Sequence, residues 1–144
     1  MRQLLIAVDP HSPERTRSAV EQAVRIWRDE FVGIRLVRVQ PRLSGHVAMF
    51  FGTRELEKMQ LEEGREDLRF AQGLLDAAGV PHTSTVLVGR SAEAIAQAAR
   101  EFGCDRILFG TEGGPSLAGK MFGSLAEQVR HLLGPGNAYQ VLGS

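Results

Sequence analysis

The chain has 144 residues, and 17 Lys and Arg residues balance 17 Asp and Glu residues. This length suits one domain spanning residues 1–144, and the neutral charge balance argues against nucleic acid as a partner. The first apolar run ends before Asp9 and Pro10, and this run is too short for a signal peptide or a membrane span. We therefore expect a soluble, cytoplasmic protein with no membrane partner.

Cysteine and histidine usage points away from redox and metal chemistry. Cys104 is the only cysteine, which excludes an internal disulfide, and it precedes an apolar run, so we expect a small buried hydrophobic residue. The four histidines are scattered, with no pair at the spacing of helical metal ligands. We expect no metal site and no catalytic residue from these side chains.

The first half of the chain predicts two strands, each followed by a helix. The strands are expected at residues 3–8 and 34–39, where the apolar residues are continuous. Ser12 is expected to cap the first helix, with an apolar stripe running from Ala19 to Trp27. A loop over residues 41–52, with an apolar patch at 47–51, precedes a long helix from Thr53, which Gly79 and Pro81 end.

The second half continues the alternation. Strands are expected at residues 83–88 and 106–109, with a weaker one at 138–142. Between them, Ser91 is expected to cap one helix and Gly103 to end it, and Gly123 and Ser124 are expected to open the last helix. This order predicts an α/β fold in which helices cover both faces of a parallel sheet. Function is then expected at the carboxyl ends of the strands, where the strand order reverses.

A glycine-rich segment, GTEGGPSLAGKMFGS from Gly110 to Ser124, follows the fourth strand. It is not a P-loop, because Met121 replaces the hydroxyl residue that binds magnesium and Pro115 lacks an N–H group. The dinucleotide-binding fingerprint would have to follow the first strand, where no glycine occurs, and the G-x-S-x-G nucleophile motif is missing. What remains is a backbone cradle for an anion at a helix start, or a flexible turn with Ser124 as an N-cap.

The spacing of this segment resembles a known motif. Gly110, two residues, Gly113, nine residues, then Gly123 and Ser124 is similar to the adenine-nucleotide motif G-2x-G-9x-G-(S/T) of the universal stress protein family. The runs LLIAVD at 4–9, LVRV at 36–39, VG at 88–89 and DRILFG at 105–110 also resemble landmarks of that family, in the same order. The resemblance covers nearly the whole chain.

The resemblance implies a fold and a binding site. The fold is a single-domain three-layer sandwich of the adenine nucleotide alpha hydrolase-like type, with a five-stranded parallel sheet in the order 3-2-1-4-5. The switch point then lies between Asp9 and Gly110. The site residues implied are Asp9 beside the nucleoside, the Val39 backbone at the adenine edge, and Gly110, Gly113, Gly123, the Ser124 hydroxyl and the Leu125 N–H around the ribose and phosphates. Without the resemblance, Asp9 is read as a turn residue before Pro10.

Two departures from the family pattern bear on this interpretation. Glu112 places a negative charge inside the motif, and this charge would repel the phosphates if it points inward. If Glu112 faces solvent, Lys120, Arg90 or His11 is expected to supply the charge that balances the phosphates. In this family the last strand is usually strongly apolar and often pairs two subunits, whereas here it is less apolar. A homodimer is therefore expected, but the resemblance does not define its geometry.

The leading hypothesis is a stress-response module that binds ATP or another adenine nucleotide, with or without Mg²⁺, and forms a homodimer. Slow ATP hydrolysis or autophosphorylation, with Asp9 and His11 near the nucleotide, is an alternative. A nucleotide-free dimeric interaction module is a second alternative, because of Glu112 and the apolar patch at 47–51.

Overall fold

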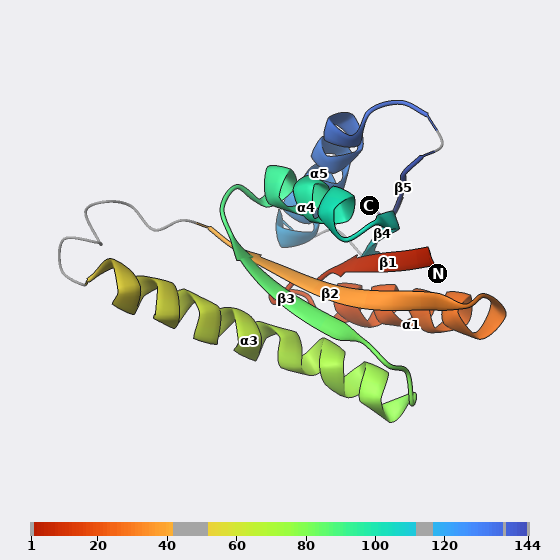
Figure 1. Ribbon diagram of the computed structural model, residues 1–144, viewed down its shortest axis with the longest axis horizontal. Coiled ribbons are helices and arrows are strands. Elements are labelled where there is room, and N and C mark those ends of the chain that lie inside the picture. The colour runs from red at the N-terminus through yellow and green to blue at the C-terminus, as the bar shows by residue number, and fades with distance from the viewer. Residues whose placement is uncertain (1, 42–51, 112–116, 137, 144) are drawn as a thin grey trace.

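The computed structural model describes residues 2–41, 52–111, 117–136 and 138–143, and it places the side chains of these residues except Thr53 and residues 117–124 (Figure 1). The elements along the chain are β1 (Arg2–Ala7), α1 (Pro13–Asp29), β2 (Val32–Gln40), α3 (Thr53–Ala77), β3 (Thr83–Val88), α4 (Ser91–Glu101), β4 (Cys104–Gly110), α5 (Leu117–Leu133) and β5 (Gln140–Gly143). None of the helices in this described part of the chain is long and apolar enough to cross a membrane.

The strands form one five-stranded sheet with the order β3-β2-β1-β4-β5, and all the neighbouring pairs are parallel. β1 is central, with Ala7 opposite Val37 of β2 and Ile6 opposite Leu108 of β4. The predicted fold class and strand order are therefore confirmed. From β1 the chain first adds β2 and β3 along one edge of β1, and it later adds β4 and β5 along the other edge. The switch point, where the strand order reverses, therefore lies between β1 and β4.

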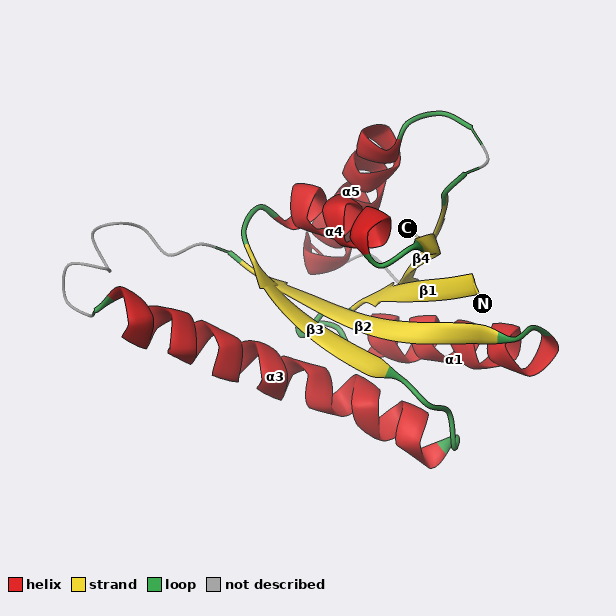
Figure 2. Cartoon of the chain, viewed as in Figure 1, coloured by secondary structure: helices red, strands yellow, loops and turns green. Residues whose placement is uncertain are grey.

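Two apolar layers hold the helices against the sheet, with α1 and α3 on one face and α4 and α5 on the other (Figure 2). Alternate residues of β1 belong to different layers. Leu4 and Ile6 pack with α1 and α3, whereas Leu5 and Ala7 pack on the face covered by α4 and α5. The period-two alternation of a strand explains this division. Burial of each large aliphatic side chain contributes about 1.5–3 kcal/mol, so β1 is stabilised from both faces.

The helix ends follow local chemistry. The Ser12 side chain caps α1 by accepting from the Arg15 N–H at 3.2 Å, as the sequence predicts. At the end of α3, Gly79 has φ +71°, its N–H donates to the Asp76 carbonyl, and the Val80 N–H donates to the Leu75 carbonyl. This pattern is a Schellman motif, which requires a left-handed residue at the Gly79 position.

Two predicted helix starts are wrong. Arg90, and not Ser91, is the N-cap of α4, and no side chain caps that helix. Arg90 has an extended backbone after the turn at Gly89, so Ser91 is already the first helical residue. The last helix begins at Leu117 instead of Gly123, because residues 117–122 are mostly good helix formers and a single glycine costs only about 1 kcal/mol inside a helix.

The strand predictions are right in number and order but differ at their ends. β3 has the predicted bounds, whereas β2 extends to Val32 and Gln40, and β5 covers Gln140–Gly143. β2 is extended by pairing on both sides, since β1 and β3 flank it. The predicted loop over residues 41–52, including its apolar patch, lies almost wholly outside the described residues.

Candidate functional site at the switch point

A cavity of about 710 Å³ opens at the carboxyl ends of β1 and β2, between the start of α4 and the middle of α5. Its lining comes from four parts of the chain that are far apart in sequence. The lining residues are Asp9, Pro10, His11, Arg38, Pro41, Arg90, Ser91, Ala92, Glu93, Leu125 and Gln128. A cavity at this place is expected for an open α/β sheet, since ligands bind beyond the strand ends at the switch point.

Asp9 is the buried acid of this cavity. Its side chain is 5% exposed, and its Oδ1 accepts from the His11 N–H at 2.9 Å. Thr16 donates its hydroxyl to the Asp9 carbonyl at 3.2 Å. Asp9 therefore forms a local turn before Pro10, as its sequence context predicts, and it also lines the cavity, as a nucleotide-binding role requires.

Arg15 joins Asp9 to the first glycine of the motif. Its Nε lies 3.9 Å from Asp9 Oδ2, and its Nη1 donates to the Gly110 carbonyl at 3.1 Å. The Arg15 side chain is only 3% exposed, so this is a buried ion pair. Removing one partner of such a pair typically costs about 3–5 kcal/mol. Arg15 was not predicted from the sequence as a site residue, although its place four residues before the buried Ala19 on the same helical face was a usable signal.

Gly110 is required by the packing of the sheet against α1. Its φ is +74°, and a Cβ at this position would overlap the carbonyl oxygen of Arg15. The next residue is held by the same helix, because the Thr111 N–H donates to the Ser18 hydroxyl at 3.2 Å. The beginning of the glycine-rich segment is therefore fixed by α1, independently of any ligand.

Val39 does not line the cavity itself, but it lies at the end of β2 between Arg38 and Pro41, which do. The Val8 N–H donates to the Val37 carbonyl on the β1 side, and the Gly89 N–H donates to the Gln40 carbonyl on the β3 side. Because successive residues of a strand turn their backbone groups to opposite sides, Val39 faces the β1 side. β1 pairing ends at Ala7, opposite Val37, so the Val39 N–H and carbonyl face the space beyond the end of β1.

Arg38 lines the cavity and was not predicted from the sequence as a site residue. Its Nε donates to Asp67 Oδ2 of α3 at 2.9 Å, its Nη1 to the Val39 carbonyl at 2.6 Å, and its Nη2 to Gln40 Oε1 at 3.2 Å. Arginine in a mostly buried strand is a signal, since such a side chain needs partners. Here the partners fix the guanidinium at the base of the cavity.

The remaining predicted site residues come from the glycine-rich segment and α5. Leu125 lines the cavity. Gly123 and Ser124 lie within α5, whose first residue is Leu117. Gly113 and Glu112 lie outside the described residues, and the side chain of Lys120 is likewise not described. The structure thus brings Asp9 and Leu125 to one cavity, places Val39 between the lining residues Arg38 and Pro41, and places Gly110 at the end of the neighbouring strand β4. The nucleotide-binding role of each of these residues stays a prediction.

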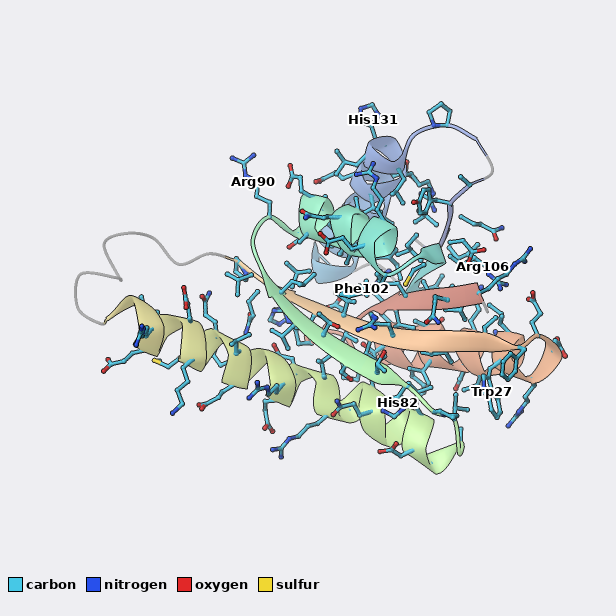
Figure 3. The ribbon with its side chains drawn as sticks, in the orientation of Figure 1. Trp27, His82, Arg90, Phe102, Arg106 and His131 are labelled. Carbon is cyan, nitrogen blue, oxygen red and sulfur yellow. The ribbon has the colours of Figure 1, made fainter. Side chains whose placement is uncertain are left out.

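Charges of both signs surround the cavity. Arg38 and Arg90 are positive, whereas Asp9 and Glu93 are negative. Arg90 is 88% exposed and points outward from the start of α4 (Figure 3). Among the described residues, no group of His, Cys, Asp and Glu side chains is arranged to hold a metal ion.

Two groups with shifted pKa values lie at the opposite, amino edge of the sheet. Burial raises the pKa of the Cys104 thiol to about 11, in agreement with a buried hydrophobic role. A hydrogen bond from Arg106 lowers the pKa of Glu30, which also lies near Arg2. These residues are structural, and they do not contribute to the cavity.

These features define a doubly wound α/β domain with a ligand-sized cavity at its switch point. The sequence model of the universal stress protein family matches residues 1–133. The chain therefore belongs to the universal stress protein family. None of the curated proteins compared with the chain matches it.

Solved structures share this fold over almost their full length. A universal stress protein family member from Burkholderia pseudomallei has 25% identity and a TM-score of 0.65, with 99% of this chain and 94% of that chain covered. The universal stress protein from Archaeoglobus fulgidus in complex with dAMP has 21% identity and a TM-score of 0.68, with 99% and 97% covered. A family protein from Arabidopsis thaliana with AMP bound has 15% identity and a TM-score of 0.61, with 99% and 90% covered.

Proposed function

We propose that this protein binds an adenine nucleotide in the switch-point cavity and acts as a regulatory module of the cytoplasmic stress response. The observation that carries the proposal is the buried carboxylate of Asp9 at the carboxyl end of β1, inside a cavity of about 710 Å³. Support comes from family membership and from the two structural neighbours solved with dAMP and with AMP.

In this proposal the nucleoside lies beside Asp9, with the base at the Val39 backbone. The glycines Gly110, Gly113 and Gly123, the Ser124 hydroxyl and the Leu125 N–H hold the ribose and phosphates of ATP, ADP or AMP. Any Mg²⁺ enters with the phosphates. Its role is to neutralise phosphate charge.

The position at which α5 starts places a condition on the proposed phosphate contact at the Leu125 N–H. Only the first four N–H groups of a helix lack an intrahelical partner, and Leu125 is well beyond them when α5 begins at Leu117. A phosphate contact at Leu125 therefore requires the bound state to begin the helix near Ser124. Gly119 and Gly123 reduce the cost of this change, since each is about 1 kcal/mol less favourable in a helix than alanine.

The proposal is tested by calorimetric titration of the protein with ATP, ADP and AMP, each with and without Mg²⁺. We expect one site per chain, and we expect Ser124→Ala to weaken binding by about tenfold, as loss of a hydrogen bond to a charged group does. Ser84→Ala is the matched control, because Ser84 accepts from Gln72 on an exposed surface away from the cavity. No heat and no thermal stabilisation at millimolar nucleotide would contradict the proposal.

We also propose that the protein is a homodimer that pairs through β5. β5 is at one edge of the sheet, and an edge strand presents unpaired backbone groups. Light scattering on a size-exclusion column tests this directly, because the chain mass is 15.8 kDa. A mass of twice that value is expected, and a single-chain mass at micromolar concentration would contradict it.

A further inference from the structure

A part-buried polar network joins Arg38, which lines the cavity, to α3. Arg38 is held by Asp67 of α3 and by the Gln40 side chain. Gln40 in turn donates through its Nε2 to the Gln60 carbonyl at 3.3 Å, and Gln60 donates through its Nε2 to the Pro41 carbonyl at 2.6 Å. Gln40 and Gln60 are both buried. With the Val39 carbonyl, the guanidinium of Arg38 has three partners, so its position is set before any ligand enters.

The important contact of this guanidinium is with the Val39 carbonyl. Arg38 Nη1 lies 2.6 Å from that oxygen, which faces the space beyond the end of β1. In the proposed function, this carbonyl is the acceptor for an amino group on the base. In this chain, a positive donor already occupies it.

Whether a bound purine base is compatible with this guanidinium depends on its substituent at C6. A carbonyl oxygen can accept two hydrogen bonds, but an incoming amino group would then lie against the positive guanidinium. An oxygen at C6 would instead accept from it, because a guanidinium has five N–H donors and Arg38 uses three in the contacts described. Arginine paired with the oxygen of a 6-oxopurine is a strong recognition geometry in general.

We propose that Arg38 is a specificity-determining residue of this cavity, and that it admits 6-oxopurine nucleotides alongside 6-aminopurine nucleotides. The inference rests on the proposed nucleotide function and narrows it, since it names purine nucleotides as the ligand class and the C6 substituent as the group that Arg38 reads.

The test compares AMP with IMP, which differ in whether C6 carries an amino group or an oxygen. Calorimetry on the unmodified protein should give dissociation constants for the two within about tenfold of each other. In Arg38→Met the ratio of IMP to AMP dissociation constants should rise by at least about tenfold, because one charged hydrogen bond to the oxygen is lost and the Val39 carbonyl is released. Both nucleotides are measured on the same sample, so a change in the folded fraction does not alter the ratio.

Arg35→Met is the matched control. Arg35 is in the same strand, but its guanidinium lies 3.9 Å from the centre of the Phe102 ring and donates to Thr85 Oγ1 at 2.8 Å, away from the cavity. This variant should leave the ratio unchanged.

The outcomes separate the two proposals. An unmodified protein that prefers AMP over IMP by more than about a hundredfold, a discrimination beyond one typical charged hydrogen bond, would overturn the role of Arg38 without any variant. An Arg38→Met ratio equal to that of the unmodified protein would also overturn it. If neither nucleotide binds at millimolar concentration, the proposed function itself is wrong, and this inference fails with it.

Discussion

At the scale of single residues, the site depends on groups that serve structure and binding together. Asp9 forms a turn with His11, pairs with Arg15 and lines the cavity. Gly110 accepts from Arg15 and packs closely on α1. The first part of the binding motif is thus present because the fold needs it, and a motif glycine is not by itself proof of a ligand.

Replacement of Gly110 by alanine should therefore damage stability before it affects any ligand. We expect the left-handed backbone to cost about 1–2 kcal/mol and the overlap with the Arg15 carbonyl to add about 1–3 kcal/mol. Gly79→Ala is the control, since Gly79 has φ +71° with open space around its missing Cβ. Urea unfolding of both variants measures the difference, and equal losses would show that contact with α1 is not what requires glycine at position 110.

At the scale of elements, apolar periodicity and helix stop signals predicted the alternating strands and helices well. They did so because β1 is buried from both faces and α3 ends in a glycine with a left-handed backbone. Helix starts were harder to predict, since a serine before an apolar run is compatible with either the cap or the first turn. The backbone of Arg90, which no sequence pattern reveals, decided between the two for α4.

The two serines provide a matched test of capping. Ser12→Ala should destabilise the protein by about 1 kcal/mol, because the Arg15 N–H loses its acceptor. Ser91→Ala should change stability by less than about 0.5 kcal/mol, because Ser91 is inside α4 and is not its cap. Chemical denaturation of both variants checks the contrast. A loss of about 1 kcal/mol at Ser91 would mean that its hydroxyl caps α4 in solution.

At the scale of the whole molecule, strand order brings distant residues to one cavity. A parallel sheet predicts a site at the carboxyl ends of the strands, and Asp9 does line a cavity there. The roles of Val39 and Gly110 were implied by the family resemblance and stay predictions. Arg15 and Arg38 could not be assigned in this way, because their roles depend on side-chain contacts to Asp9, Asp67 and backbone carbonyls that are remote in sequence or set by rotamer. The gap between prediction and structure is therefore in the charged residues that organise the site.

The most direct measurement of the central claim is a nuclear magnetic resonance titration of the ¹⁵N-labelled protein with AMP. If the nucleotide binds at the switch point, amide shifts should change at the carboxyl edge of the sheet, at Asp9, His11, Val39 and Leu125. Amides at the amino edge, such as those of Val32 and Cys104, should stay in place. Shifts confined to the amino edge, or no shifts at millimolar AMP, would contradict a nucleotide site at the carboxyl ends of β1 and β4.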